Sequence, residues 1–139
     1  MNYAHTITVS LPYEEAIALA KQELANQGFG VLTEIDIRAT FTTKLGAESA
    51  DAVGDYLILG ACNPPLAEQA LAADPDMGLL LPCNVVIRRS QSAETTTVQA
   101  INPQTMVQLS DVAAVKGVAD QADERLRAAL AAIEGASSS

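Results

Sequence analysis

The fold is decided by one stretch of the sequence, Tyr56-Leu57-Ile58-Leu59-Gly60-Ala61-Cys62-Asn63-Pro64-Pro65. Its first seven residues are almost all apolar, which predicts a central strand over residues 56–62 that is buried on both faces. Asn63 is a favourable helix N-cap, and a proline in the first turn already has the backbone angle of a helix. The stretch therefore predicts a strand that leads directly into a helix, which ends at the Asp-Pro-Asp of residues 74–76.

The N-terminal residues predict a strand and a helix. Residues 6–10 alternate polar and apolar side chains and are rich in β-branched types, which is typical of a strand. Ser10 is expected to cap a helix over about residues 12–27, whose first turn carries acids and whose end is marked by Gly28.

Residues 29–41 alternate between apolar and polar side chains almost without fault. This period of two predicts one long, half-buried strand with Glu34, Asp36 and Arg38 on its polar side, where Arg38 can pair with one of the two acids. Residues 44–55 have weak periodicity and carry two glycines, so they predict a loop with at most a short helical turn.

The C-terminal half predicts a hairpin followed by helices. Residues 83–88 and 95–101 have strand patterns and are expected to pair across the turn between them. A short helical turn is expected over residues 102–109, and Ser110 is expected to cap a last helix over residues 111–133.

The last helix has the most regular apolar stripe of the chain: Val112, Val115, Ala119, Ala122, Leu126, Ala129 and Ile133. The spacing of three and four residues fits packing against the domain's own sheet. It also fits a seam between two copies, because several of the side chains are small enough for close approach. The sequence leaves both interpretations open.

These elements follow the order β-α-β-β-α-β-β-α, which predicts an α+β fold. We expect a two-layer sandwich, with a mixed, mostly antiparallel sheet and the helices on one face. A chain of 139 residues has room for one domain. We expect it over residues 1–134, followed by a disordered tail over residues 135–139.

Composition and motifs narrow the function classes. Eight Lys and Arg against seventeen Asp and Glu give a net charge of −9, which argues against nucleic-acid and anionic-membrane partners. The N-terminus has no basic signal-peptide region and no window is apolar enough to span a membrane, so we expect a cytoplasmic protein with reduced thiols. The single histidine, His5, is expected at the surface or a strand end and excludes a catalytic triad or a His-rich zinc site within one chain.

The informative constellation lies in two segments that mirror each other. Residues 60–65 and 80–84 each place Cys-Asn beside proline at the edge of an apolar run. Cys62 precedes a helix whose free N–H groups would stabilise a thiolate, so it is the candidate nucleophile and is expected to be the more reactive thiol. Cys83 precedes a Val-Val-Ile run that favours the neutral thiol.

The helix between the two segments is expected to return both cysteines to one end of the sheet, where a disulfide or a shared metal needs Cα atoms within about 7 Å. Plain packing of two buried thiols is the structural alternative. The candidate ligand-binding residues are Cys62, Asn63, Cys83 and Asn84, together with Glu34 and Asp36, whose paired carboxylates would bind metal or share a proton. A solvated strand face is the alternative for Glu34 and Asp36.

Three ordered motifs resemble a known family. Residues 28–37 (Gly-Phe-Gly-Val-Leu-Thr-Glu-Ile-Asp-Ile), residues 56–64 and residues 78–85 (Gly-Leu-Leu-Leu-Pro-Cys-Asn-Val) are similar to the bacterial and archaeal family named domain of unknown function 302. The resemblance covers about residues 6–109 and fills both cysteine positions of the family, at Cys62 and Cys83. It implies a small α+β domain, commonly a homodimer, with no established reaction.

The first functional hypothesis is a homodimeric binding protein that holds a small ligand or a metal-containing cofactor, of unknown identity, near Cys62 and Cys83. The second is a thiol-based redox enzyme or sulfur carrier that uses Cys62. The third is a structural or regulatory protein without a small-molecule site. Whether the chain is an enzyme stays open at this point.

Overall fold

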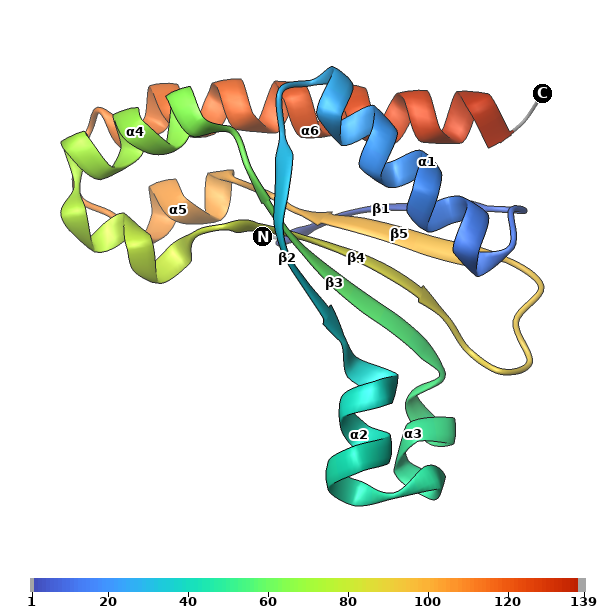
Figure 1. The fold of residues 1–139 in the computed structure, drawn as a ribbon. Helices are drawn as coiled ribbons and strands as arrows, with labels where there is room; N and C mark the ends of the chain where they lie inside the picture. Colours follow the sequence, from blue (N-terminus) through green and yellow to red (C-terminus); the bar gives the residue numbers. More distant parts are fainter. Residues whose placement is uncertain (1, 138–139) are drawn as a thin grey trace.

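The computed structural model describes residues 2–137 and contains a five-stranded sheet in the order β1-β5-β4-β3-β2 (Figure 1). All neighbouring strands are antiparallel. The strands are β1 (Ala4–Val9), β2 (Gly30–Asp36), β3 (Asp55–Cys62), β4 (Cys83–Arg89) and β5 (Thr96–Ile101). The helices are α1 (Tyr13–Asn26), α2 (Ile37–Leu45), α3 (Ala47–Val53), α4 (Pro64–Ala73), the 3₁₀ helix η1 (Pro75–Leu80), α5 (Gln104–Leu109) and α6 (Val115–Ser137).

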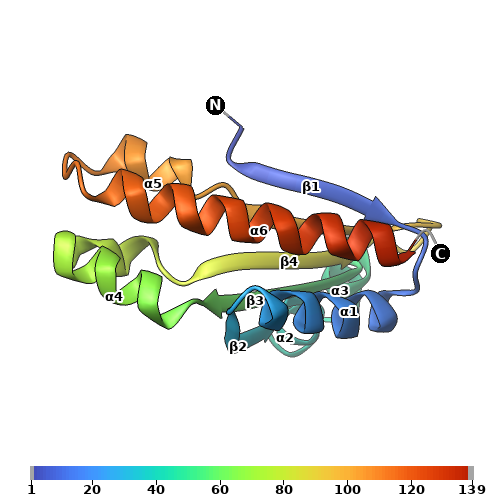
Figure 2. The same cartoon turned by 90° about the horizontal axis from the view of Figure 1, so that it is seen from above.

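The helices α1 and α6 lie across one face of the sheet, and the opposite face is open (Figures 1 and 2). The helices α4 and α5 gather at one end of the sheet, beside the start of α6. The predicted α+β fold is therefore confirmed, and the sheet, expected to be mixed and mostly antiparallel, is antiparallel at every strand pair.

The strand β3 and the helix α4 form where residues 56–65 predict them. The Asn63 side chain caps α4, and its Oδ1 accepts a hydrogen bond from the backbone N–H of Leu66 at 3.2 Å. The prediction that β3 is buried on both faces is wrong. Alternate residues such as Leu59 are buried under the helices, whereas Tyr56 and Ile58 are only half-buried, because α1 and α6 lie on the other face.

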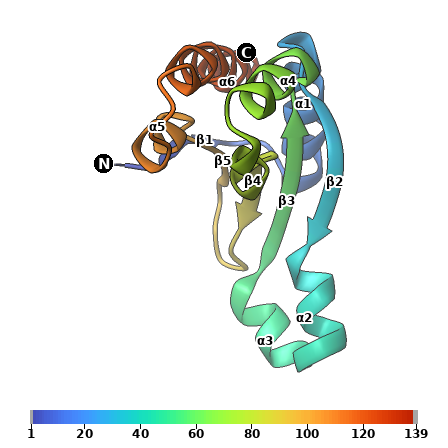
Figure 3. The ribbon, with the colours of Figure 1, turned by 90° about the vertical axis from the view of Figure 1, so that its left-hand side faces the viewer.

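The prediction of one strand over residues 29–41 is wrong in its second half, because the chain turns into α2 after Asp36 (Figure 3). The Asp36 carboxylate accepts a hydrogen bond from the backbone N–H of Ala39 at 2.9 Å and so caps this helix. Ile37 and Phe41 are four residues apart, a spacing that fits one face of a helix as well as a strand. The expected loop over residues 44–55 is mostly the helix α3, which packs against α2.

Arg38 holds this helical hairpin to the sheet. Its guanidinium contacts Asp51 at 3.0 Å and Asp55 at 2.9 Å. The prediction that Arg38 pairs with Glu34 or Asp36 is therefore wrong. Once residues 37–45 coil into α2, the side chain of Arg38 no longer follows the face of the strand.

The ends of α1 and α6 also differ from prediction. Pro12 occupies the N-cap of α1, so Ser10 does not cap it, whereas Gly28 ends the helix region with a positive φ of 84°. The last helix begins at Val115 rather than at residue 111, so Ser110 does not cap it; Ser110 donates a hydrogen bond to Asp74 at 2.7 Å and accepts one from Val112 N–H. Part of the expected tail, residues 135–137, belongs to α6, and residues 138–139 lie outside the described residues.

The apolar stripe of α6 packs inside the chain. Six of its seven members are buried, and only Val112 is exposed. The C-terminal part of the stripe, with Leu126 and Ile133, packs on the sheet and α1, while Val115, Ala119 and Ala122 join a second cluster with α4, η1 and α5. The interpretation of this stripe as a seam between copies is therefore wrong.

We expect Asp36→Ala to lower the free energy of unfolding by about 1 kcal/mol, because the first turn of α2 loses its side-chain cap. Asp36→Asn should retain most of the stability, since an amide oxygen can accept the same hydrogen bond. Urea denaturation measures both variants. An equal loss in Asp36→Asn would contradict the capping role.

Candidate functional site

The two mirrored Cys-Asn segments lie side by side in the sheet. In the antiparallel register of β3 and β4, Ala61 faces Cys83 and Gly60 faces Asn84. Pro82 lies directly over Gly60, where an added Cβ would come within 2.9 Å of the Pro82 ring and would also overlap the Thr33 hydroxyl. The close approach of Thr33 from β2 and of Pro82 before β4 therefore favours glycine at position 60.

A small cavity of about 40 Å³ lies beside this contact, between the ends of β3 and β4 and the helices α4, α5 and α6. It is lined by Phe29, Ala61, Cys62, Asn63, Leu66, Ala67, Ala70, Leu81, Pro82, Cys83, Met106, Val118 and Ala122. Its half-buried lining residues, Cys62, Ala67, Leu81 and Pro82, mark the side nearest solvent. Since a water molecule needs about 10–15 Å³ of such space and drug-sized sites about 300 Å³ or more, the cavity has room for a few atoms only.

The two cysteines are free thiols and are not near each other, so the expected cysteine pair is not formed. Successive residues of a strand point to opposite faces, and the partner of Cys83 in the register is Ala61, not Cys62. Each thiol therefore lines a different part of the cavity wall.

Cys83 and Cys62 differ in burial. Cys83 is 7% exposed, and its burial raises the pKa of the thiol to about 11, with a smaller contribution from Cys62. This agrees with the expectation of a neutral thiol at position 83. Cys62 is the half-buried last residue of β3, at the side of the cavity nearest solvent.

The expectation that N–H groups at the start of α4 stabilise a Cys62 thiolate is wrong. The first two helical positions are Pro64 and Pro65, and proline has no N–H. The next donor, Leu66 N–H, is already bonded to the Asn63 side chain, and Ala67 N–H bonds to the Asn63 carbonyl at 2.9 Å. The first four positions of α4 therefore have no N–H group left for the sulfur.

The two predicted asparagines occupy different environments. Asn63 is 8% exposed and lines the cavity, with its Oδ1 engaged in the cap. Its Nδ2 lies beside Gly28, 3.0 Å from the position that a Cβ at residue 28 would take. Asn84 is exposed on the open face of the sheet and does not line the cavity.

Glu34 and Asp36 lie away from the cavity. Glu34 forms an ion pair with Lys21 at 3.0 Å, and Asp36 caps α2. Within the part of the chain that the structure describes, no group of three or more His, Cys, Asp or Glu side chains could hold a metal ion.

Sequence reasoning missed the part of the cavity wall that comes from the C-terminal helices. Met106 from α5 and Val118 and Ala122 from α6 close the cavity opposite the strands. The apolar spacing of Val118 and Ala122 indicates a buried helix face. No pattern in the sequence indicates which end of the sheet that face covers.

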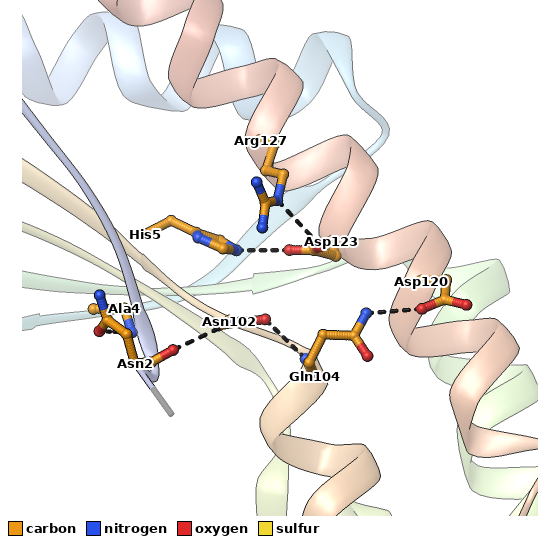
Figure 4. Close-up of polar contacts among 8 residues, drawn as sticks. All are labelled: Asn2, Ala4, His5, Asn102, Gln104, Asp120, Asp123 and Arg127. Atoms are coloured by element: carbon orange, nitrogen blue, oxygen red, sulfur yellow. Dashed lines mark hydrogen bonds and ion pairs between the residues drawn. The ribbon is translucent and has the colours of Figure 1, made fainter.

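His5 lies outside the cavity and joins β1 to α6. Its Nε2 lies 2.6 Å from the Asp123 carboxylate, which also accepts a hydrogen bond from Arg127 at 3.1 Å (Figure 4). Both His5 and Asp123 are largely buried, so the contact fixes the edge strand rather than forming a surface site.

A comparison with protein families decides the relationship, because the family described as Domain of unknown function DUF302 matches residues 5–133. The chain belongs to this family. A solved structure of an uncharacterized conserved DUF302 protein from Bacillus stearothermophilus is similar, with 28% sequence identity and a TM-score of 0.82. The match covers 96% of this chain and 99% of the other. No curated protein matches the chain.

The DUF302 match confirms the family that the three sequence motifs indicate, and it extends over more of the chain than residues 6–109. Among residues 2–137, no helix is long and apolar enough to cross a membrane.

We expect Cys62 to be alkylated faster than Cys83 in the folded protein at neutral pH. The reason is access, because Cys62 is half-buried, whereas Cys83 is buried and stays protonated up to a pKa of about 11. Iodoacetamide labelling followed by peptide mass spectrometry measures both rates. Labelling of Cys83 before Cys62 would contradict this assignment.

Proposed function

We propose that this DUF302 domain is a cytoplasmic, homodimeric protein that binds a small ligand at the cavity beside Cys62 and Cys83. The observation that carries the proposal is the cavity itself, which lies where the two cysteine-containing motifs meet and which has two thiols in an otherwise largely apolar wall. Apolar cavities of this kind stay free of water and take up small apolar molecules, because a water molecule inside would find no hydrogen-bond partners.

The dimensions limit the ligand. A space of about 40 Å³ accepts a species of a few atoms, or one end of a larger molecule that enters beside Cys62 and Pro82. The lining groups favour a soft, weakly polar species, since sulfur is polarisable and most of the wall is apolar. The metal-containing form of the proposal has less support, because the described residues include no cluster of three metal-ligating side chains among His, Cys, Asp and Glu.

The second candidate function is a thiol-based redox enzyme or a sulfur carrier that uses Cys62. The partial exposure of Cys62 supports it. Binding is favoured over this alternative because the two prolines and the Asn63 cap leave no backbone donor for the sulfur at the start of α4. A structural or regulatory protein without a ligand, the third hypothesis, would need neither the cavity nor an accessible Cys62 thiol.

The proposed dimer uses the open face of the sheet. Since the stripe of α6 is buried within the chain, this face is the remaining large surface of regular structure. Ile58 and Val86 are paired across β3 and β4 at its centre, and a shallow hollow of about 460 Å³ beside them includes Tyr56 and Gln99. Half-buried aliphatic and tyrosine side chains are typical of interface centres.

Native mass spectrometry of the protein from its own host tests the bound ligand. We expect a mass in excess of the polypeptide that is lost on denaturation. Ala122→Leu should abolish the excess mass by filling the cavity, whereas Ala129→Leu, on the same helix but away from the cavity, should retain it. Both changes add the same bulk at a buried position and cost about 1–3 kcal/mol. An excess mass that survives in Ala122→Leu, or none in the native protein, would overturn the proposed site.

Light scattering at micromolar concentration tests the dimer. We expect the native chain to have twice its own mass and Val86→Asp to have the mass of one chain, because a carboxylate would be buried without a partner in the interface. Leu45→Asp, which changes an exposed leucine at the end of α2, is the matched control and should remain dimeric. A monomeric native protein, or a dimeric Val86→Asp variant that is folded by circular dichroism, would exclude this interface.

A further inference from the structure

A group of exposed aliphatic side chains lies at the end of the molecule that carries η1 and the start of α6. Leu79 is 87% exposed, Leu109 is 65% exposed, and Leu80 and Val112 are each 37% exposed. They line one hollow of about 470 Å³, which we call the leucine hollow. It is built from two segments that are distant in the sequence, η1 and the connection from α5 to α6, which lie at the same end of the sheet (Figures 1 and 2).

The leucine hollow has an acidic rim. Asp74, Asp76 and Asp111 line it, and no Lys or Arg does. None of these three carboxylates forms an ion pair within residues 2–137. The rim therefore combines uncompensated negative charge with exposed leucine, in a chain whose net charge is already −9.

The two sides of the hollow are fixed to each other. The Ser110 hydroxyl donates a hydrogen bond to Asp74 at 2.7 Å, and the other Asp74 oxygen accepts from Asp76 N–H at 3.0 Å. Met77, which is 2% exposed, anchors η1 in the second core cluster with Met106 and Val115. The surface is therefore largely preformed, which lowers the entropy lost on binding.

We propose that the leucine hollow docks a basic amphipathic segment of a partner protein, with aliphatic side chains in the hollow and Lys or Arg against the rim. An exposed apolar surface with a charged rim is typical of an interaction site. The cations that would balance the rim come from the partner, because no Lys or Arg among residues 2–137 lines the hollow. A second copy is a poor occupant, since a two-fold contact would bring the two acidic rims together. The C-terminal end of α6, at Ser137, lies at the opposite end of this helix from the hollow (Figure 1).

The probe is a fluorescent helical peptide of leucine and lysine, measured by fluorescence anisotropy on the full chain, with a leucine and glutamate peptide as the charge control. We expect binding of the lysine peptide that weakens as salt screens the rim, and no binding of the glutamate peptide. The double variant Leu79→Ser with Leu109→Ser should weaken binding about tenfold or more, because two buried leucine contacts are lost. Asp76→Asn with Asp111→Asn should weaken binding and flatten its salt dependence.

The matched control is Leu32→Ser with Leu45→Ser, since these leucines are 66% and 64% exposed elsewhere on the surface. It should bind the lysine peptide as the native chain does. All four substituted leucines are exposed, so loss of folding does not complicate the comparison. Absence of binding or equal binding of the two peptides would overturn the proposal. Equal weakening of binding in the Leu79→Ser/Leu109→Ser variant and in the Leu32→Ser/Leu45→Ser control would also overturn it. So would a native dimer that becomes monomeric only in the Leu79→Ser and Leu109→Ser variant, which would make a second copy the occupant.

Discussion

The antiparallel pairing of β3 with β4 places Gly60 under Pro82, and the position of the other groups around the cavity depends on this contact. The absence of a side chain at Gly60 lets the segment before β4 lie close to the sheet. This brings Leu81 and Cys83 to the end of β3, where α4 begins. The helices α5 and α6 then close the far side, and the small side chains of Ala61, Ala70 and Ala122 leave an apolar space that the backbone does not fill.

The chemistry of this space follows from how its polar groups are already used. Pro64 and Pro65 remove two backbone donors from the start of α4, and the Asn63 carboxamide takes the next. Cys83 is held as a neutral thiol by burial, with a pKa of about 11. The cavity therefore offers little stabilisation to a thiolate or to any other anion, which is why uptake of a small, weakly polar ligand is favoured over nucleophilic catalysis. The protein's net charge of −9 also disfavours an anion in the cavity.

Much of the fold follows from local patterns in the sequence, and the failures have identifiable causes. The apolar run before Asn63-Pro64-Pro65 predicts both β3 and α4, because burial and capping agree there. Residues 37–41 satisfy the period of a strand and also the spacing of a helix, and the Asp36 cap decides between them. The mirrored Cys-Asn segments correctly indicate the end of the sheet at which the cavity lies. The pairing register, which separates Cys62 from Cys83, and the contribution of Met106 depend on long-range packing that no local pattern encodes.

Ligand binding requires that the space beside Gly60 and Pro82 is an apolar cavity that a small molecule can enter. Methyl NMR spectra of the native protein under increasing xenon pressure test it most directly, since xenon enters apolar cavities of small size. We expect saturable shifts confined to the methyl groups of Leu66, Met106, Val118 and Ala122. Shifts that are absent there, or that appear instead around Leu126 and Ile133 in the core under the sheet, would contradict it.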